Sequence, residues 1–359
     1  MPETSFQEQI IPGTFIRVLS EGLISVGGIS SGNIGIVGTA SAGIGETHNL
    51  SDYPTAQATF GAYDAYGGGA GTLNLTRALE VLYRNGARTI YARAVAAGAD
   101  QAAFSAAFDE VVKESVNILV APELTTAQAK AVLGVVDAVE DNGRDMIAVI
   151  GSDATAVADI LAQRTTNDRI IMTTPGIRAF DAAASAEVTL SGTYSAAAVA
   201  GLISSLAPQS SPTNKVLSGV VKLAQRFSYG QLTQLVNEQN GRMLVLEERQ
   251  GVRVVRGLTT DDGAFKQITT RRIVDFAKAG IRIACNPYIG RLNNQRVRKA
   301  MQSTIDGFLT TMVQDEALIA YTLEVTATRA DEIAGRAIVN VVLQPTFSID
   351  YIRVTLVLE

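Results

Sequence analysis

The chain has 359 residues, of which 47% are hydrophobic and 18% are charged, and its formal net charge is -5. This length and apolar content are enough for two globular domains with a substantial core. Acidic and basic residues are interspersed along the sequence and form no basic block, which argues against a direct nucleic-acid partner.

Residues 1–28 are expected to form an N-terminal arm. Apolar and polar side chains alternate over residues 14–19, which predicts a strand. The residues expected to carry its pairing are Phe15, Ile16, Arg17 and Val18. No hairpin partner follows, so this strand must pair with a distant segment or with another chain. Three glycines then provide flexible points: Gly22, Gly27 and Gly28.

The N-terminus and the apolar stretches bear on location. The first residues lack the basic region and apolar core of a secretory signal. The longest apolar stretches are shorter than a membrane span. We therefore expect a protein that folds in the cytoplasm and does not insert into a membrane.

Residues 29–261 alternate between strand and helix patterns. Strands are predicted at 34–38, 89–95, 117–121, 146–150 and 170–173, and helices at 72–85, 102–112, 126–141 and 154–164. Strands that are joined through helices favour right-handed crossovers and a mostly parallel sheet. This part of the chain is therefore expected to be an α/β domain.

Residues 262–345 have a different character, typical of an α+β domain. A strand-to-helix unit is predicted at 265–278 and ends at Gly280, and a strand follows at 281–284. Asn293 or Asn294 could cap a longer helix, and two further strands are predicted at 321–328 and 336–343. Residues 346–359 then form a C-terminal arm strand, whose apolar line consists of Ile352, Val354, Leu356 and Leu358.

Few residues offer catalytic or metal-binding chemistry. His48 is the only histidine and is expected to be a solvated loop residue, and Cys285, the only cysteine, a small buried residue on a strand. One histidine and one cysteine do not supply the familiar zinc ligand sets. A P-loop needs a Gly-Lys pair, which the sequence lacks. We therefore expect no metal, no cofactor and no catalytic site.

One segment is similar to the nucleophile helix of subtilisin-like proteases. Residues 192–201 contain Gly-Thr, then small residues, then Val-Ala-Gly. Thr193 or Tyr194 occupies the nucleophile position, depending on the alignment. Ser195 would need His48 as its base, and His48 lies too early in the chain for that role. The similarity implies a subtilisin-like scaffold without the chemistry. A divergent serine hydrolase that uses Ser195 and a small-ligand-binding α/β protein stay open as alternatives.

The order of motifs over more than three hundred residues resembles the tail sheath proteins of contractile phages. A small-residue helix leads into a turn and a β-like segment at 211–220, SPTNKVLSGV, and the second sharp motif is GVRVVRGLTT at 251–260. Weaker matches are Pro12–Ile16, Gly35–Ala40, Thr72–Val95, Thr270–Ile273 and the Asn286-Pro287 turn. The chain is short for the family and lacks the tryptophan often found there.

This resemblance implies a structural subunit of a contractile tail. The two arm strands would cross to neighbouring subunits and complete their C-terminal sheets, with the three glycines as hinges. The polymer would surround an inner tail tube protein, contact baseplate and tail terminator proteins, and contract to drive the tube through a cell envelope. Its place would be a virion tail or an equivalent particle, assembled in the bacterial host cytoplasm. A basic cluster is our candidate for contact with the tube: Arg291, Arg296, Arg298 and Lys299.

Overall fold

A computed structural model describes residues 28–66 and 72–357. Its larger domain is built on an eight-stranded sheet with the order β11-β10-β6-β5-β4-β1-β3-β2. The strands are β1 (Ile34–Thr39), β2 (Thr47–Leu50), β3 (Ile90–Val95), β4 (Ile118–Val120), β5 (Ile147–Gly151), β6 (Ile170–Thr174), β10 (Leu244–Glu248) and β11 (Val252–Val254). All neighbours from β10 to β3 are parallel, whereas the edge strands β11 and β2 are antiparallel. The predicted mostly parallel sheet is therefore confirmed.

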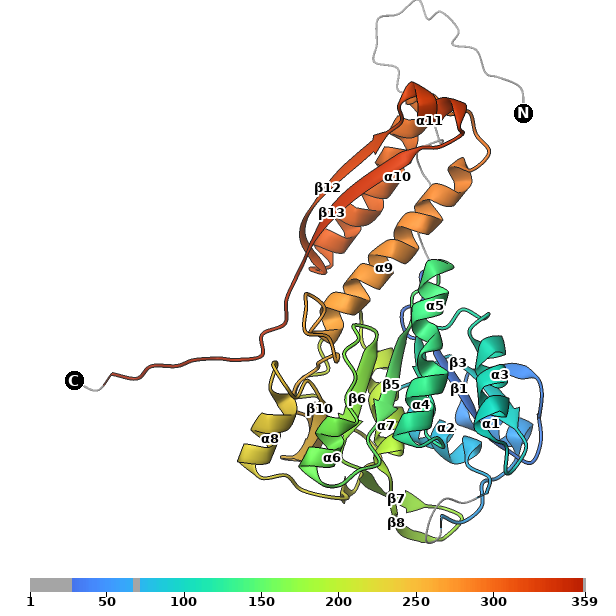
Figure 1. Cartoon of the computed structure of the whole chain (residues 1–359), viewed down its shortest axis with the longest axis vertical. Coiled ribbons are helices and arrows are strands. Elements are labelled where there is room, and N and C mark those ends of the chain that lie inside the picture. The colour runs from blue at the N-terminus through green and yellow to red at the C-terminus, as the bar shows by residue number, and fades with distance from the viewer. Residues whose placement is uncertain (1–27, 67–71, 358–359) are drawn as a thin grey trace, which may run out of the picture.

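Helices cover both faces of this sheet (Figure 1). They are α1 (Tyr53–Phe60), α2 (Leu75–Arg84), α3 (Gln101–Val111), α4 (Thr126–Leu133), α5 (Val135–Asp141), α6 (Val157–Ala162), α7 (Gly192–Ser205) and α8 (Tyr229–Val236). Successive side chains of β1 point to opposite faces of the sheet. Ile36 packs in the core that contains α2 and α7, and Val37 packs in the core that contains α3 and α4. Both faces are apolar, as expected for a buried parallel sheet.

Helix α7 lies unusually close to the sheet. A Cβ atom at Gly192 would lie only 1.9 Å from the carbonyl oxygen of Ser152, just after β5. Only glycine fits such an approach. The small residues of this helix therefore serve close packing. Next to it, a three-stranded sheet has the order β8-β7-β9 and consists of β7 (Ile177–Asp181), β8 (Ala186–Leu190) and β9 (Lys222–Leu223).

The C-terminal domain extends away from the sheet domain (Figure 1). It contains α9 (Ile268–Cys285), the short 3-10 helix η2 (Asn286–Tyr288), α10 (Gln295–Gln314), β12 (Leu318–Thr326), α11 (Arg329–Ile333) and β13 (Ile338–Pro345). Asn294 caps α10, because its side chain accepts a hydrogen bond from the backbone N–H of Val297. The predicted α+β character of this domain is confirmed, as are the two strands predicted at 321–328 and 336–343.

Several local predictions were wrong. The strand at 281–284 does not exist, because α9 continues to Cys285, which is partly exposed at a helix end. His48 lies on the edge strand β2, where its ring packs edge-to-face on Phe60 at 5.4 Å, and is not a solvated loop residue. The β-like segment at 216–220 forms only one isolated bridge, between Val216 and Arg253. The helix at 126–141 is divided at Gly134 into α4 and α5.

Among the described helices, none has the length and apolarity to cross a membrane.

Candidate functional site: an open hairpin and an unpaired arm

The hydroxyl groups of Thr193 and Ser195 on α7 are buried and hydrogen-bonded. The Ser195 side chain is fully buried, and its hydroxyl donates to the carbonyl oxygen of Gly192 over 2.6 Å. It also lies 3.1 Å from the hydroxyl of Thr173 on β6. His48 lies on β2, five strand positions from β6, which corresponds to roughly 24 Å at about 4.8 Å per strand. His48 therefore cannot activate Ser195. Thr193 uses its hydroxyl to donate to the carbonyl oxygen of Pro122 over 2.6 Å.

Glu123, a half-buried residue that follows β4, lies at the end of the sheet near Thr193. Glu123 accepts hydrogen bonds from the backbone N–H of Thr39 over 2.8 Å and from its hydroxyl over 2.6 Å. Burial raises the pKa of Glu123 to about 7. These bonds fasten the loop after β4 to the end of β1. In the described ranges, no group of three or more His, Cys, Asp and Glu side chains is arranged to hold a metal ion.

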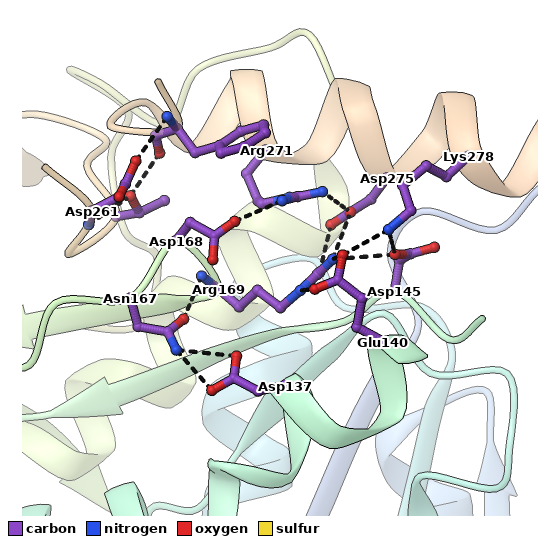
Figure 2. Close-up of polar contacts among 12 residues, drawn as sticks. Asp137, Glu140, Asp145, Asn167, Asp168, Arg169, Asp261, Arg271, Asp275 and Lys278 are labelled. Atoms are coloured by element: carbon purple, nitrogen blue, oxygen red, sulfur yellow. Dashed lines mark hydrogen bonds and ion pairs between the residues drawn. The ribbon is translucent and has the colours of Figure 1, made fainter. Parts of the chain in front are cut away.

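An ionic network joins the sheet domain to α9 (Figure 2). Its centre is Arg169, whose side chain is 0% exposed and pairs with Glu140, Asp145 and Asp275 at 2.6, 3.1 and 3.2 Å. Arg271 of α9 bridges Asp168 at 2.7 Å and Asp275 at 2.5 Å. The remaining pairs join Lys278 to Glu140 and Asp145, and Arg282 to Asp145. Four cations and four carboxylates are thus connected at the domain junction, and pairs such as Arg169–Asp275 and Arg271–Asp168 cross it.

The network shifts the titration of its members in both directions. The hydrogen bond from Arg169 lowers the pKa of Glu140 to about 2, so this carboxylate stays ionised in mild acid. Burial raises the pKa of Asp275. A buried charge that loses its partner is strongly destabilising. The junction is therefore held as a unit, and we expect the two domains to move together.

The C-terminal domain ends in a hairpin whose strands, β12 and β13, pair only with each other in the described part of the chain. Side chains on one face, such as Leu323 and Val341, pack on the cluster around Phe308 of α10. The other face carries Ile338 and Val342, which are 41% and 68% exposed. Because β12 and β13 form a sheet of only two strands, each strand has an outer edge. The backbone N–H and C=O groups of these edges could pair with a further strand.

The C-terminal arm leaves this hairpin as an extended segment that has no strand partner within residues 28–66 and 72–357 (Figure 1). All residues from 351 to 357 are exposed. Three residues of the predicted apolar line, Ile352, Val354 and Leu356, are 83%, 73% and 88% exposed. Leu358 lies outside the described residues. A row of exposed aliphatic side chains of this kind marks an interaction surface.

The predicted N-terminal site residues lie outside the described part of the chain. These are Phe15, Ile16, Arg17, Val18, Gly22 and Gly27. Gly28 is exposed and has a φ of 79°, which suits glycine at the entry to the sheet domain.

The basic cluster lies at the far end of the C-terminal domain. Arg298 is half-buried and donates to Asn293 Oδ1 over 2.8 Å and to Glu332 Oε1 of α11 over 3.0 Å, so it holds its own domain together. Arg291, Arg296 and Lys299 are exposed. Beside them lies an exposed apolar tip that sequence reasoning missed, formed by Ile289, Leu292 and Ile333.

Two family models match adjacent parts of the chain. The phage tail sheath protein central domain matches residues 96–260, and the phage tail sheath C-terminal domain matches residues 260–359. Together they cover 264 of the 359 residues. The comparison with curated protein sequences gave no match.

Solved sheath structures share the fold over almost the whole chain. The helical sheath of the anti-feeding prophage in its contracted state has a TM-score of 0.73 and 20% identity, covering 98% of this chain and 99% of that chain. The PVC sheath complex of an extracellular contractile injection system, also contracted, has a TM-score of 0.75 and 16% identity, covering 98% of both chains. A sheath tail protein from Desulfitobacterium hafniense has a TM-score of 0.65 and 13% identity, covering 93% of this chain and 100% of that chain.

At these identities the solved structures establish the fold, and the family models establish the relationship. The two sheath domains follow one another in this chain in the order central then C-terminal. The chain therefore belongs to the phage tail sheath protein family and is a structural subunit of a contractile sheath.

Proposed function

We propose that this subunit polymerises helically around an inner tube by exchanging terminal strands, and that contraction of the polymer drives the tube through a target cell envelope. One observation carries the strand exchange. The same chain presents an exposed apolar arm and a hairpin with two open edges. Each feature is incomplete alone, and each can be completed by its counterpart on another copy.

The energetics favour pairing with a neighbouring copy. Arm residues 351–357 span about 23 Å when extended, comparable with one strand of the hairpin. A net ~1 kcal/mol per main-chain hydrogen bond, together with burial of the three exposed aliphatic side chains, gives several kcal/mol per strand before the cost of ordering. We propose that the N-terminal strand at residues 14–19 adds to the other open edge.

The geometry of exchange favours an open helix. The donor is the arm and the acceptor is the hairpin, so the contact joins two unlike surfaces. Figure 1 shows the arm running away from its own hairpin. Repetition of such a heterologous contact produces a filament unless it closes into a ring.

We propose that the far end of the C-terminal domain contacts the tube. Arg291, Arg296 and Lys299 would meet acidic groups there, and the apolar tip would add buried area. Arg298 remains part of the predicted cluster, although it is engaged with α11. We further propose contacts with baseplate and tail terminator proteins at the two ends of the polymer, and assembly in the bacterial host cytoplasm.

We also infer that the energy of contraction comes from burying more surface between subunits, without catalysis. The closed environment of Ser195 supports this, since its hydroxyl is buried and donates to a backbone carbonyl group. A fluorophosphonate probe should leave the folded chain unlabelled. Labelling at Ser195 would instead favour the serine hydrolase alternative.

Electron microscopy of the purified full-length chain tests the strand exchange. Helical tubes or rings should form, and they should vanish when residues 346–359 or residues 1–20 are removed. Circular dichroism of the truncated chains serves as the control, because the fold should survive both deletions, and none of the residues 346–357 belongs to a hydrophobic core cluster. Tubes that persist without either arm would contradict the proposal.

A further inference from the structure

The C-terminal arm does not become free where the hairpin ends. The backbone N–H of Thr346 donates to the carbonyl oxygen of Ala317 over 3.1 Å, next to the last hairpin pair. From there to Asp350 the chain alternates, with even-numbered residues turned toward the protein and odd-numbered ones exposed. Ile349 is 80% exposed, whereas the Asp350 side chain is 7% exposed. The fully exposed run starts only at residue 351.

Asp350 occupies a socket formed by Thr213, Arg256 and Gln267, which we call the Asp350 socket. Its Oδ2 accepts hydrogen bonds from Arg256 Nε over 2.7 Å and from Gln267 Nε2 over 3.1 Å. Its Oδ1 accepts a longer one from the Thr213 hydroxyl over 3.4 Å. Arg256 also pairs with Glu238 at 2.6 Å, and its side chain is 9% exposed. A charge-assisted hydrogen bond of this kind is roughly twice as strong as one between neutral groups.

Gln267 holds the backbone of the arm as well. Its amide donates to the carbonyl oxygen of Ser348 over 3.2 Å and accepts from the Ser348 N–H over 3.0 Å. The hydroxyls of Thr269 and Ser348 lie 3.2 Å apart. Gln267 is the N-cap residue of α9, yet its side chain makes no capping hydrogen bond. The side chain serves the arm instead.

The socket itself is braced by two segments that are distant in sequence. The backbone N–H of Asn214 donates to the carbonyl oxygen of Val254 over 2.8 Å. The N–H of Gly257 donates to the Thr213 hydroxyl over 3.0 Å. The two sharpest sequence motifs, at 211–220 and 251–260, thus lie side by side and supply Thr213 and Arg256.

We propose that the Asp350 socket is a mechanical anchor, which keeps tension on the exchanged arm from reaching the hairpin. This inference rests on the strand exchange proposed above. Without the anchor, a pull on the arm would act on the Thr346 bond and then on successive β12–β13 pairs, so the ladder would open one pair at a time. With the anchor, the bonds to Ser348 and Asp350 share the load and transmit it to the sheet domain.

The test compares Asp350→Ala with Arg353→Ala in the full-length chain. Removing Asp350 leaves Arg256 paired with Glu238, so no buried charge is stranded and the fold should survive. Arg353 is an exposed arm residue beyond the socket and serves as the control. Both variants should assemble. When contraction is triggered, wild-type and Arg353→Ala sheaths should stay intact, whereas Asp350→Ala sheaths should break into short pieces. Asp350→Ala sheaths that contract intact overturn the anchor.

A second variant and a second readout keep the test independent of one mutant. Gln267→Ala removes the contacts to Ser348 without removing a charge and should give the same breakage. Hydrogen exchange of the unassembled chain should show the Ser348 amide protected in the wild type and exchanging about tenfold faster in either variant. Equal exchange rates would overturn the anchor alone. Wild-type tubes that do not need residues 346–359, or no tubes at all, would overturn the strand exchange itself.

Discussion

At the scale of single residues, Glu123 gives the clearest pH dependence. Burial raises its pKa from 4.5 to about 7 in the folded chain. Its contribution to stability is therefore complete below about pH 4.5 and is lost as the pH rises through about 7. Glu123→Gln cannot ionise. It should match the wild type at pH 5 and exceed it at pH 8, by roughly 3 kcal/mol. Chemical denaturation at both pH values measures this, and a difference that does not change with pH would contradict it.

Residues that act locally could be predicted from the sequence, and residues that act over long distances could not. Asn294 was identified as a possible cap because its partner, Val297, is three positions away. Asp350 is separated from Arg256 by 94 positions, and Arg169 from Asp275 by 106. An acidic residue within an apolar alternating arm was the one available signal for Asp350. The motifs at 211–220 and 251–260 contain Thr213 and Arg256, but nothing in the sequence linked these residues or Gln267 to Asp350.

At the scale of elements, the packing of α9 on α10 depends on one glycine. A Cβ atom at Gly280 would lie 2.0 Å from Cζ of Phe308. Gly280→Ala should therefore destabilise the chain by about 1–3 kcal/mol, because the ring must move. The matched control is Gly307→Ala on α10, where a Cβ atom has open space and should stabilise by about 0.5–1 kcal/mol. Thermal denaturation that ranks the two variants in the opposite order would rule out this role.

The same glycine explains why one element was mispredicted. Gly280 reads as the end of a helix, and the alternating residues after it read as a strand. In the structure, Gly280 allows Phe308 of α10 to pack closely against α9. Helix α9 continues through this glycine and ends at Cys285. The buried strands of the parallel sheet were predictable, because continuous apolar runs between helices have few other interpretations. The alternation of the C-terminal arm can be read from the sequence, but the hydrogen bonds of Asp350 to Arg256 and Gln267 cannot.

At the scale of the whole molecule, the junction network should determine cooperativity. Arg169→Met leaves Asp145 and Asp275 with fewer partners in a buried setting and should cost about 3 kcal/mol. Arg282→Ala is the control, since its side chain is 39% exposed, and should cost less than about 1 kcal/mol. Denaturant titration should also show two transitions for Arg169→Met if the domains separate. If both variants lost the same free energy of unfolding, Arg169 would contribute no more to stability than the exposed Arg282.

This penalty should depend on acidity. The pKa of Glu140 is lowered from 4.5 to about 2, so its contribution is present above about pH 4.5 and disappears as the pH falls through about 2. The difference between Arg169→Met and the wild type should therefore persist at pH 4 and shrink toward pH 2. Denaturation at these two pH values measures it, and a penalty that grows in acid would contradict the assignment.

The strand exchange proposed above would also give the assembled polymer a direction. At one end, the last subunits would have hairpins that have received no arm from a neighbour. At the opposite end, arms would project without a hairpin to pair with. The two caps of such a filament must therefore be chemically opposite, one supplying strands and the other offering vacant sheet edges. A single protein could not close both ends in the same way, and growth from a base that offers one kind of end would proceed in one direction only.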